Sequence, residues 1–185
     1  MAKLFSPLKI REVELKNRIA VSPMCQYSSV NGLPTEWHLV HLGSRAVGGA
    51  ALIIQEATAV SPEGRISPDD AGIWNEMQME AYKRITSFIT SQESVPGIQI
   101  AHAGRKGSTY SPWKGAGEVK IDDGGWQTFS ASPINFADNY PSPKEMDKED
   151  IRKVIDDFGR AADRSIEAGF KIMQKALQEL SVGEL

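Results

Sequence analysis

The only cysteine of this 185-residue chain, Cys25, lies in the hexapeptide SPMCQY, residues 22–27. An apolar run precedes it and the turn-forming pair Asn31-Gly32 follows, so the thiol comes where a strand gives way to a loop. A lone cysteine often packs as a small apolar residue. A nucleophilic thiolate needs a base or a helix N-terminus nearby, and the sequence shows neither. A third possibility is a thiol that hydrogen-bonds a cofactor and tunes its electronics.

Polar side chains also interrupt an apolar strand further along the chain. Gln99 lies inside the run GIQIA, residues 97–101, and His102 follows it in the sequence AHAGRK. A buried amide without partners costs about 1–3 kcal/mol, so Gln99 either faces a ligand or bonds to neighbouring backbone. His102 is open to a polar role at the strand end or to a structural role with satisfied hydrogen bonds.

Two further histidines, His38 and His41, stand three residues apart on an expected helix. Metal ligation by such a pair needs further ligands, and no cluster of Glu, Asp or Cys supplies them in the sequence. We therefore expect no metal site and assign both histidines to the helix surface or to packing. The tryptophans are interpreted as packing residues; they are Trp37, Trp74, Trp113 and Trp126.

The composition is that of an ordinary soluble globular protein, with 41% hydrophobic and 24% charged residues. A net charge of −3 without a dense Lys/Arg cluster predicts no nucleic-acid partner. The longest apolar stretch, residues 50–54, is far shorter than the roughly 20 residues of a membrane span, so we expect no membrane association. A single cysteine and an N-terminus without an apolar signal region favour a cytoplasmic location.

Strand and helix patterns alternate along the chain. Residues 8–16 are typical of a small hairpin, and apolar strands are expected at residues 19–24, 51–56 and 97–101. Helices are expected to begin at the N-caps Thr35, Asn75 and Asp147. The last helix is expected to bury a stripe of Ile151, Val154, Ile155, Phe158, Ala162 and Ile166. Before it lies a Gly-, Pro- and Ser-rich insertion, residues 104–145, which we expect to be functional or hairpin-forming.

This alternation predicts an α/β protein with parallel strands, either a doubly wound sheet or a (β/α) barrel. No phosphate-cradling glycine motif follows any strand, which weakens the dinucleotide-binding alternative. In a barrel the chemistry lies at the C-terminal ends of the strands. Cys25, Glu56 and Gln99 all occur at such ends, so the barrel is favoured.

Several stretches, collinear along residues 4–170, together resemble one family. They are LFSPLKIREVELKNRIAVSPMCQY, EATAVSPEGRIS, GIW, GIQIAHAGRK and YPSPKEMDKEDI. As a set they are similar to the Old Yellow Enzyme flavoproteins, and most to the bacterial-type NADPH dehydrogenases, ene-reductases and xenobiotic reductases with a cysteine at the flavin. The resemblance implies the N-terminal portion of a (β/α)8 TIM barrel, with about three βα units preceded by a β-hairpin.

The resemblance also implies the cofactor and the chemistry. FMN would be reduced by NADPH or NADH and would pass hydride to a small electron-poor alkene, such as an enone or a quinone. The cofactor contacts would be Ser22, Pro23, Met24, Cys25, Ala57 and Gln99. Cys25 would hydrogen-bond the reactive edge of the flavin, Gln99 would pair with its pyrimidine edge, and Tyr27 would project into the substrate pocket. A flat, largely apolar slot with a few fixed donors suits a reduced flavin.

The resemblance stops after Phe170, where the family continues with a fourth strand and an H-x-x-H-G-Y motif. Residues 171–185 read KIMQKALQELSVGEL, with helix-like spacing of the apolar residues and no histidine or tyrosine. We therefore predict two parts. Residues 1–170 would be the N-terminal part of an FMN-binding barrel, and residues 171–185 a helical tail foreign to the family.

A complete barrel takes roughly 250 residues, so we expect a truncated oxidoreductase with impaired activity. An alternative is a non-catalytic fragment or half-barrel interaction module, which associates with a partner chain or with itself through open sheet edges. A third interpretation is lyase chemistry with Lys106 as a Schiff-base former, although the sequence offers nothing that would activate this lysine.

Overall fold

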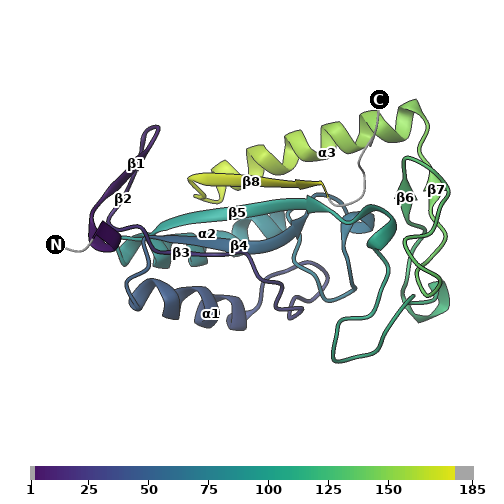
Figure 1. Cartoon of the computed structure of the whole chain (residues 1–185), viewed down its shortest axis with the longest axis horizontal. Coiled ribbons are helices and arrows are strands. Elements are labelled where there is room, and N and C mark those ends of the chain that lie inside the picture. Colours follow the sequence, from purple (N-terminus) through teal and green to yellow (C-terminus); the bar gives the residue numbers. More distant parts are fainter. Residues whose placement is uncertain (1–2, 178–185) are drawn as a thin grey trace.

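The centre of the molecule is a four-stranded parallel sheet, seen in a computed structural model that describes residues 3–177 (Figure 1). Its strands are β3 (Ala20–Val21), β4 (Leu52–Ala59), β5 (Val95–His102) and β8 (Ile172–Leu177), in the order β3-β4-β5-β8. All three neighbouring pairs are parallel, so their carboxyl ends meet at one edge of the sheet.

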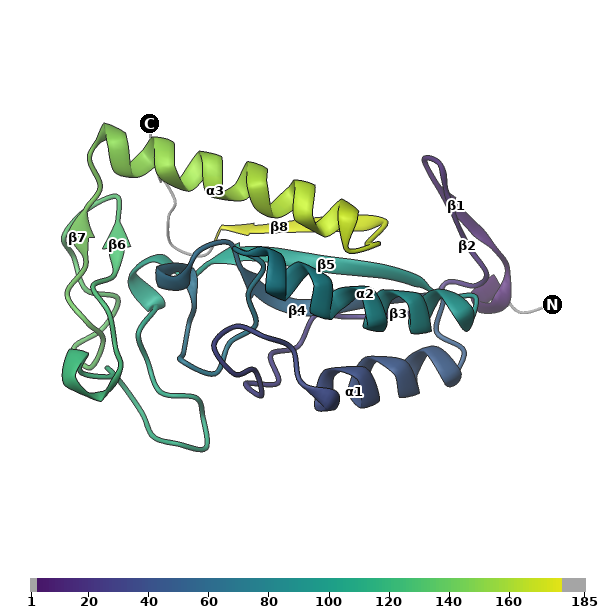
Figure 2. The ribbon, with the colours of Figure 1, turned by 180° about the vertical axis from the view of Figure 1, so that it is seen from behind.

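Three helices connect the parallel strands, and their predicted starts are confirmed. They are α1 (Glu36–Val47), α2 (Glu76–Ser91) and α3 (Lys148–Glu167), with Thr35, Asn75 and Asp147 as N-caps. At α2 the Asn75 side chain accepts the N–H of Gln78 at 2.9 Å, which satisfies one of the amides that a helix start leaves without a partner. Figure 2 shows α2 in front of the sheet, flanked by α1 and α3.

The main core lies between the sheet and the helices. Ile53 and Ile98 from neighbouring strands meet Tyr82 and Ile89 of α2, and all four are almost completely buried. Leu52 points to the opposite face, because side chains alternate along a strand. There it packs with Leu15 of the hairpin β1 (Leu8–Ile10) and β2 (Val13–Leu15) in a second, smaller cluster. The predicted hairpin is thus confirmed at the amino end of the sheet.

The insertion at residues 104–145 lies at the other end, beyond the carboxyl ends of the strands (Figure 1). Its regular structure is limited to the short turns η3 (Gly104–Lys106) and η4 (Ile121–Asp123) and two strands of two residues each, β6 (Phe129–Ser130) and β7 (Lys144–Glu145). β6 pairs in parallel with β7, just before α3. The insertion therefore borders the end of the sheet where a barrel carries its chemistry.

The helical tail predicted from residue 171 is wrong for residues 172–177, which form the strand β8. β8 pairs with β5 from Gly97 opposite Ile172 to His102 opposite Leu177. The apolar spacing of so short a segment fits a helix or a strand, and the backbone N–H and C=O groups along β5 decide in favour of a strand because it satisfies them. The sheet thus has four parallel strands where we expected three. The rest of the predicted tail helix, residues 178–185, lies outside the described residues.

The stripe predicted for α3 is only partly buried. Phe158 is buried, and Val154 and Ala162 pack partly against the core. By contrast Ile155 and Ile166 are exposed by 64% and 62%. The inward face of α3 instead carries small or polar residues such as Ala161 and Ser165, which allow close approach to the sheet.

Candidate active site

The structure brings together three of the predicted cofactor contacts at the ends of neighbouring strands. The thiol of Cys25, four residues after β3, hydrogen-bonds with the backbone of Ala57 in β4. Ala57 pairs with Gln99 in β5. The side-chain amide of Gln99 donates in turn to Gln174 of β8 at 3.1 Å. A thiol, a buried alanine and a carboxamide therefore follow one another across the sheet.

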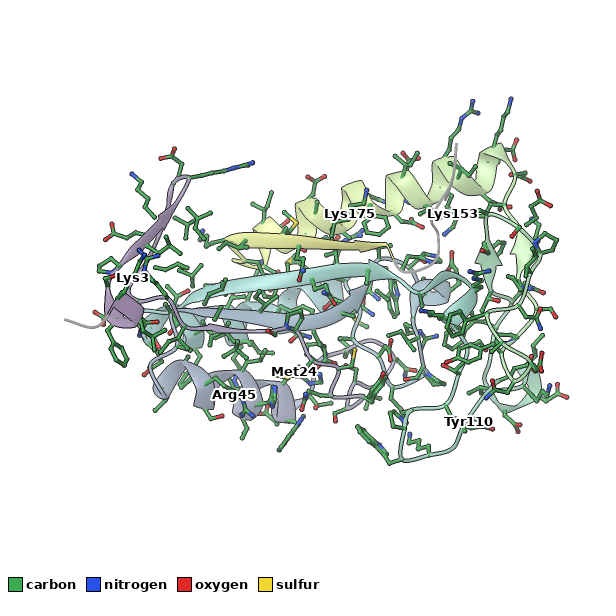
Figure 3. The ribbon with its side chains drawn as sticks, in the orientation of Figure 1. Lys3, Met24, Arg45, Tyr110, Lys153 and Lys175 are labelled. Carbon is green, nitrogen blue, oxygen red and sulfur yellow. The ribbon has the colours of Figure 1, made fainter. Side chains whose placement is uncertain are left out.

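The other predicted contacts precede Cys25 in the same loop. Ser22 and Met24 are exposed, and Pro23 is partly buried between them. Figure 3 shows Met24 in this loop, near the middle of the view, and Tyr110 in the insertion, further to the right. The loop therefore presents side chains and backbone at the carboxyl end of the sheet, next to the thiol.

Burial raises the pKa of the Cys25 thiol to about 12, and the nearby carboxylates of Asp70 and Glu56 add to this rise. Hydrogen bonds from the Ala57 backbone and the Tyr27 side chain lower it, but by less. At neutral pH the group is a protonated thiol, which donates a hydrogen bond and is a poor nucleophile. Of the three chemistries open to Cys25, a nucleophilic thiolate is therefore the least compatible with its surroundings.

Tyr27 lies beside the thiol in an unusual backbone conformation, with φ at +47°. A non-glycine residue in this left-handed region is uncommon and needs support from its surroundings. The ring of Trp113 gives part of that support, meeting the Tyr27 ring edge-to-face with centroids 5.5 Å apart. Trp113 is itself 64% exposed, so this tryptophan, which we predicted as a packing residue, packs at the rim of the site and not in the core.

The turn that carries Trp113 is held in place by Asp69. The Asp69 carboxylate accepts the hydroxyl of Ser111 at 2.9 Å and lies 2.7 Å from the ammonium of Lys114. The backbone carbonyl of the same residue accepts the N–H of Ser29 at 3.0 Å. Asp69 therefore links the insertion to the loop that contains Cys25 and Tyr27.

A buried polar network lies behind the Cys25 loop. One oxygen of Glu56 accepts the N–H of Gln26 at 3.0 Å, and the other lies 3.6 Å from Nε2 of His38. Nδ1 of His38 accepts the N–H of Thr35 at 2.9 Å. Both His38 and Glu56 are almost completely buried. His38 is thus a packing residue, as predicted for this helix, and also a member of a polar chain that the sequence did not reveal.

Asp70 is a second buried carboxylate near the thiol. It accepts hydrogen bonds from the backbone of Ile66 at 2.7 Å and from the Ser67 hydroxyl at 2.7 Å. Burial nevertheless raises its pKa to about 6, with a smaller contribution from the charge of Glu56. Nothing in the residue pattern marks Asp70, because its partners and its burial arise from the turn that follows β4.

His102 serves the structural role that we left open for it. Its Nδ1 accepts the N–H of Gly104 at 3.1 Å, and the ring is almost fully buried. Burial lowers the pKa of His102 to about 4, so the imidazole is neutral at physiological pH. His41 packs in α1, where burial and the charge of Arg45 lower its pKa. Within residues 3–177 no group of three His, Cys, Asp or Glu side chains is placed to hold a metal ion.

No helix in the described part of the chain is long and apolar enough to cross a membrane.

Residues 3–174 match the model of the NADH:flavin oxidoreductase / NADH oxidase family, and the chain belongs to this family. The match runs four residues beyond the boundary that we predicted and includes part of β8. The family assignment that we based on the Old Yellow Enzyme resemblance is thereby confirmed.

Named relatives agree with the family model. The chain is 44% identical to an NADH:flavin oxidoreductase of Gibberella zeae over 93% of its own length and 43% of the relative's. It is also 44% identical to an NADPH dehydrogenase of Listeria monocytogenes, covering 94% of this chain and 48% of that one. The chain spans less than half the length of these relatives.

A solved structure confirms the predicted fold. The Old Yellow Enzyme homologue of Zymomonas mobilis superimposes with a TM-score of 0.78 at 27% identity, over 94% of this chain and 48% of that structure. The parallel sheet with its helices is therefore the N-terminal part of a (β/α)8 barrel, and it is not closed within the described residues.

The residues at the strand ends fit the flavin that the family binds. An isoalloxazine ring is flat, with broad apolar faces and a polar edge, so it needs small neighbours and a few fixed hydrogen-bonding groups. Ala57 supplies a methyl group and Gln99 a carboxamide from adjacent strands, and Cys25 supplies a neutral thiol from the loop after β3. The donor set thus suits an uncharged ring edge better than a metal ion or a free phosphate.

Proposed function

We propose that this chain carries the ring-binding part of an FMN site in an NAD(P)H-dependent oxidoreductase that reduces activated alkenes. The convergence of Cys25, Ala57 and Gln99 on adjacent strand ends is the observation that carries the proposal. Family membership and the NADPH dehydrogenase relatives support it. When bound, FMN accepts hydride from a nicotinamide and delivers it to an electron-poor alkene, such as an enone or a quinone.

Each residue has a distinct task in this proposal. Cys25 keeps its proton and donates a hydrogen bond to the reactive edge of the flavin, while Gln99 binds the pyrimidine edge. Ala57 lies against the ring, and the backbone of the loop formed by Ser22, Pro23 and Met24 lines one side of it. Tyr27, with Trp113 behind it, forms a wall of the substrate pocket.

These 185 residues alone would bind FMN weakly and reduce alkenes poorly. The sequence contains three histidines, His38, His41 and His102, and none of them belongs to an H-x-x-H-G-Y motif that would hold the substrate oxygen. Contacts to the FMN phosphate normally supply a large electrostatic part of the affinity. We place the protein in the reducing cytoplasm, in keeping with its single cysteine.

The test is a titration of FMN fluorescence with the purified chain. We expect saturable quenching, and roughly fivefold to tenfold weaker binding for Gln99→Ala, because the ring edge loses a hydrogen-bonding partner. Gln92→Ala is the matched control, since Gln92 is the C-cap of α2 and its side chain donates to the exposed Ser91. Absence of saturable quenching, or equal affinities for the Gln99→Ala variant and the unaltered chain, would contradict the proposal.

A second candidate function is association with another chain, or another copy, at the flanks of the sheet. Exposed apolar side chains on α1 and α3 favour it; they are Trp37, Val40, Val47, Ile151, Ile155 and Ile166. Exposed apolar surface next to sheet edges commonly marks a contact site. Analytical ultracentrifugation tests the self-association form of this proposal, and a monomer at every concentration would exclude that form.

A further inference from the structure

We propose that Glu56 and His38 are positioning residues, which hold the loop containing Cys25 and Tyr27 against the end of β4. Neither residue would touch the flavin or the substrate. The proposal rests on a bulge in β4, on a backbone N–H and an imidazole nitrogen that approach one carboxylate, and on a helix cap that fixes the imidazole ring.

The first observation is an irregularity in the pairing of β4 with β5. Gln55 lies opposite Ile98, but Ala57 lies opposite Gln99, so Glu56 is an extra residue in the strand. Such a bulge re-aims a side chain and often occurs next to an active site. Here it turns Glu56 toward the loop that follows β3, where the carboxylate meets the backbone of Gln26.

The second observation is that two donors approach the two oxygens of Glu56. The Gln26 N–H donates to Oε2 at 3.0 Å, and Nε2 of His38 lies 3.6 Å from Oε1. Gln26 lies directly between Cys25 and Tyr27, so this bond fixes the backbone that carries both functional side chains. A carboxylate can accept on both sides, whereas an amide of the same shape must turn its NH2 group toward one of the donors.

The third observation fixes the ring of His38. Its Nδ1 accepts the N–H of Thr35 at the start of α1, which leaves the proton on Nε2, facing Glu56 and Ser29. The hydroxyl of Thr35 also donates to the carbonyl of Ser28, two residues beyond Gln26 in the loop. The start of α1 therefore holds both the imidazole and the loop that the imidazole helps to support.

The other ionisable groups near Glu56 complete the electrostatic setting. Its charge contributes to the raised pKa values of Cys25, Tyr27, Asp70 and Tyr82, though burial is the first cause in each case. Glu56 thus does two things at once: it holds the loop through Gln26, and its charge helps to keep the thiol of Cys25 protonated.

The consequence for catalysis rests on the flavin role that we proposed for Cys25, but the positioning itself can be measured without flavin. Cys25 is the only cysteine of the chain, so the rate of alkylation by iodoacetamide against pH reports this thiol alone. Hydrogen exchange of the Gln26 amide, followed by NMR, reports the bond to Glu56. In the unaltered chain we expect this loop amide to be protected as strongly as amides within β4.

Four variants separate positioning from charge. Glu56→Gln and His38→Gln should both speed exchange of the Gln26 amide roughly tenfold. The first variant weakens the acceptor of the Gln26 N–H, and the second removes the imidazole that holds the Glu56 carboxylate in place. Glu56→Gln should also speed alkylation of Cys25 roughly threefold to tenfold at fixed pH, because a negative charge is lost. Asp70→Asn should speed alkylation without affecting the Gln26 amide. Glu63 lies in the turn that follows β4, and its carboxylate pairs with Lys153. Glu63→Gln should change neither the alkylation rate nor the exchange of the Gln26 amide.

The proposal fails if the Gln26 amide of the unaltered chain exchanges as fast as exposed loop amides. It also fails if the folded Glu56→Gln and His38→Gln variants keep full protection, or if Glu63→Gln removes protection equally. Should Glu56→Gln not fold, the His38→Gln variant and the unaltered chain still decide. If the exchange and alkylation results are as expected but FMN does not bind, the flavin function is rejected and the positioning role is retained.

Discussion

β4 and β8 are strands of the same parallel sheet, yet their surroundings are opposite. In β4 every residue except Ile54 is buried, and paired strands lie on both sides of it. In β8 the side chains of Met173, Gln174 and Lys175 are exposed, and β5 is its only partner within the described residues. The enclosed strand carries the bulge and the buried carboxylate, while the peripheral strand offers one side-chain hydrogen bond, between its Gln174 and Gln99.

This difference shows where the sheet can hold a polar group rigidly. A buried carboxylate needs donors from several directions, and an enclosed strand has neighbouring segments on more sides to supply them. Glu56 accepts a hydrogen bond from a loop and lies close to an imidazole of a helix, while Gln174 meets solvent and one partner. The rigid parts of the candidate site should therefore lie around β4, and the adaptable parts at β8 and at the rim formed by the insertion.

The largest expected effect comes from truncating an apolar side chain in each strand. Ile53→Ala in β4 should lower the free energy of unfolding by about 2–5 kcal/mol, since Ile53 is completely buried and its loss leaves a cavity. Met173→Ala in β8 should cost about 0.5 kcal/mol or less, because Met173 is 40% exposed. Urea denaturation measures both, and equal losses would contradict the difference in burial between the two strands.

The next effect concerns two buried ionisable groups, Asp70 after β4 and His102 at the end of β5. The raised pKa of Asp70, about 6, means that the folded state binds a proton before the unfolded state does, so this group makes stability fall as the pH rises from about 4 to 6. The lowered pKa of His102, about 4, acts in the opposite sense, so stability rises with pH from about 4 to 6.5. The two contributions should largely cancel in the unaltered chain.

Replacing one of the two groups should reveal how the other group makes stability depend on pH. Asp70→Asn should lose about 2–3 kcal/mol of stability when the pH is lowered from 6.5 to 4, whereas His102→Gln should gain stability over the same interval. Unfolding in urea at a series of pH values measures both profiles. Parallel profiles for the two variants would show that these groups are not held in the buried states described.

The smallest effect is expected at the rim, where Tyr27 meets Trp113. A double-mutant cycle with Tyr27→Ala and Trp113→Ala should give a coupling energy of about 0.5–1 kcal/mol, the range of an edge-to-face aromatic pair. The pair Phe136 and Tyr140, with ring centroids 4.9 Å apart inside the insertion, is a matched control. A coupling energy well above 1 kcal/mol would mean that the rim is as rigid as the enclosed strand.

Much of the fold could be predicted because its signals are local. Each helix start is marked within a few residues by its N-cap, Thr35, Asn75 or Asp147. The apolar strands are continuous in sequence. β8 could not be predicted in this way, because six residues with ambiguous spacing become a strand only when β5 lies beside them. The exposed isoleucines of α3 were misjudged for a similar reason, since a helix pattern does not say which side meets the sheet.

The same distinction between local and long-range signals applies to the candidate site. The spatial grouping of Cys25, Ala57 and Gln99 follows from parallel strands whose ends meet at one edge, so it could be predicted, while their roles toward flavin stay predictions. The links from Glu56 to Gln26 and to His38 could not be predicted, because they span 30 and 18 positions and depend on a bulge without a sequence signature. Asp69 and Trp113 likewise meet the site only through the folded insertion.

The additional residue in β4 also interrupts the alternation of side chains between the two faces of the sheet. Before it, Gln55 faces the helices together with Ile98; after it, Ala57 shares the open face with Gln99, and Thr58 takes the helix side opposite Ile100. Deleting Glu56 would place Ala57 directly after Gln55, so Ala57 would stay on the open face opposite Gln99, but the carboxylate that accepts the N–H of Gln26 would be lost. One inserted residue thus adds a buried carboxylate to the strand while Ala57 keeps its place opposite Gln99.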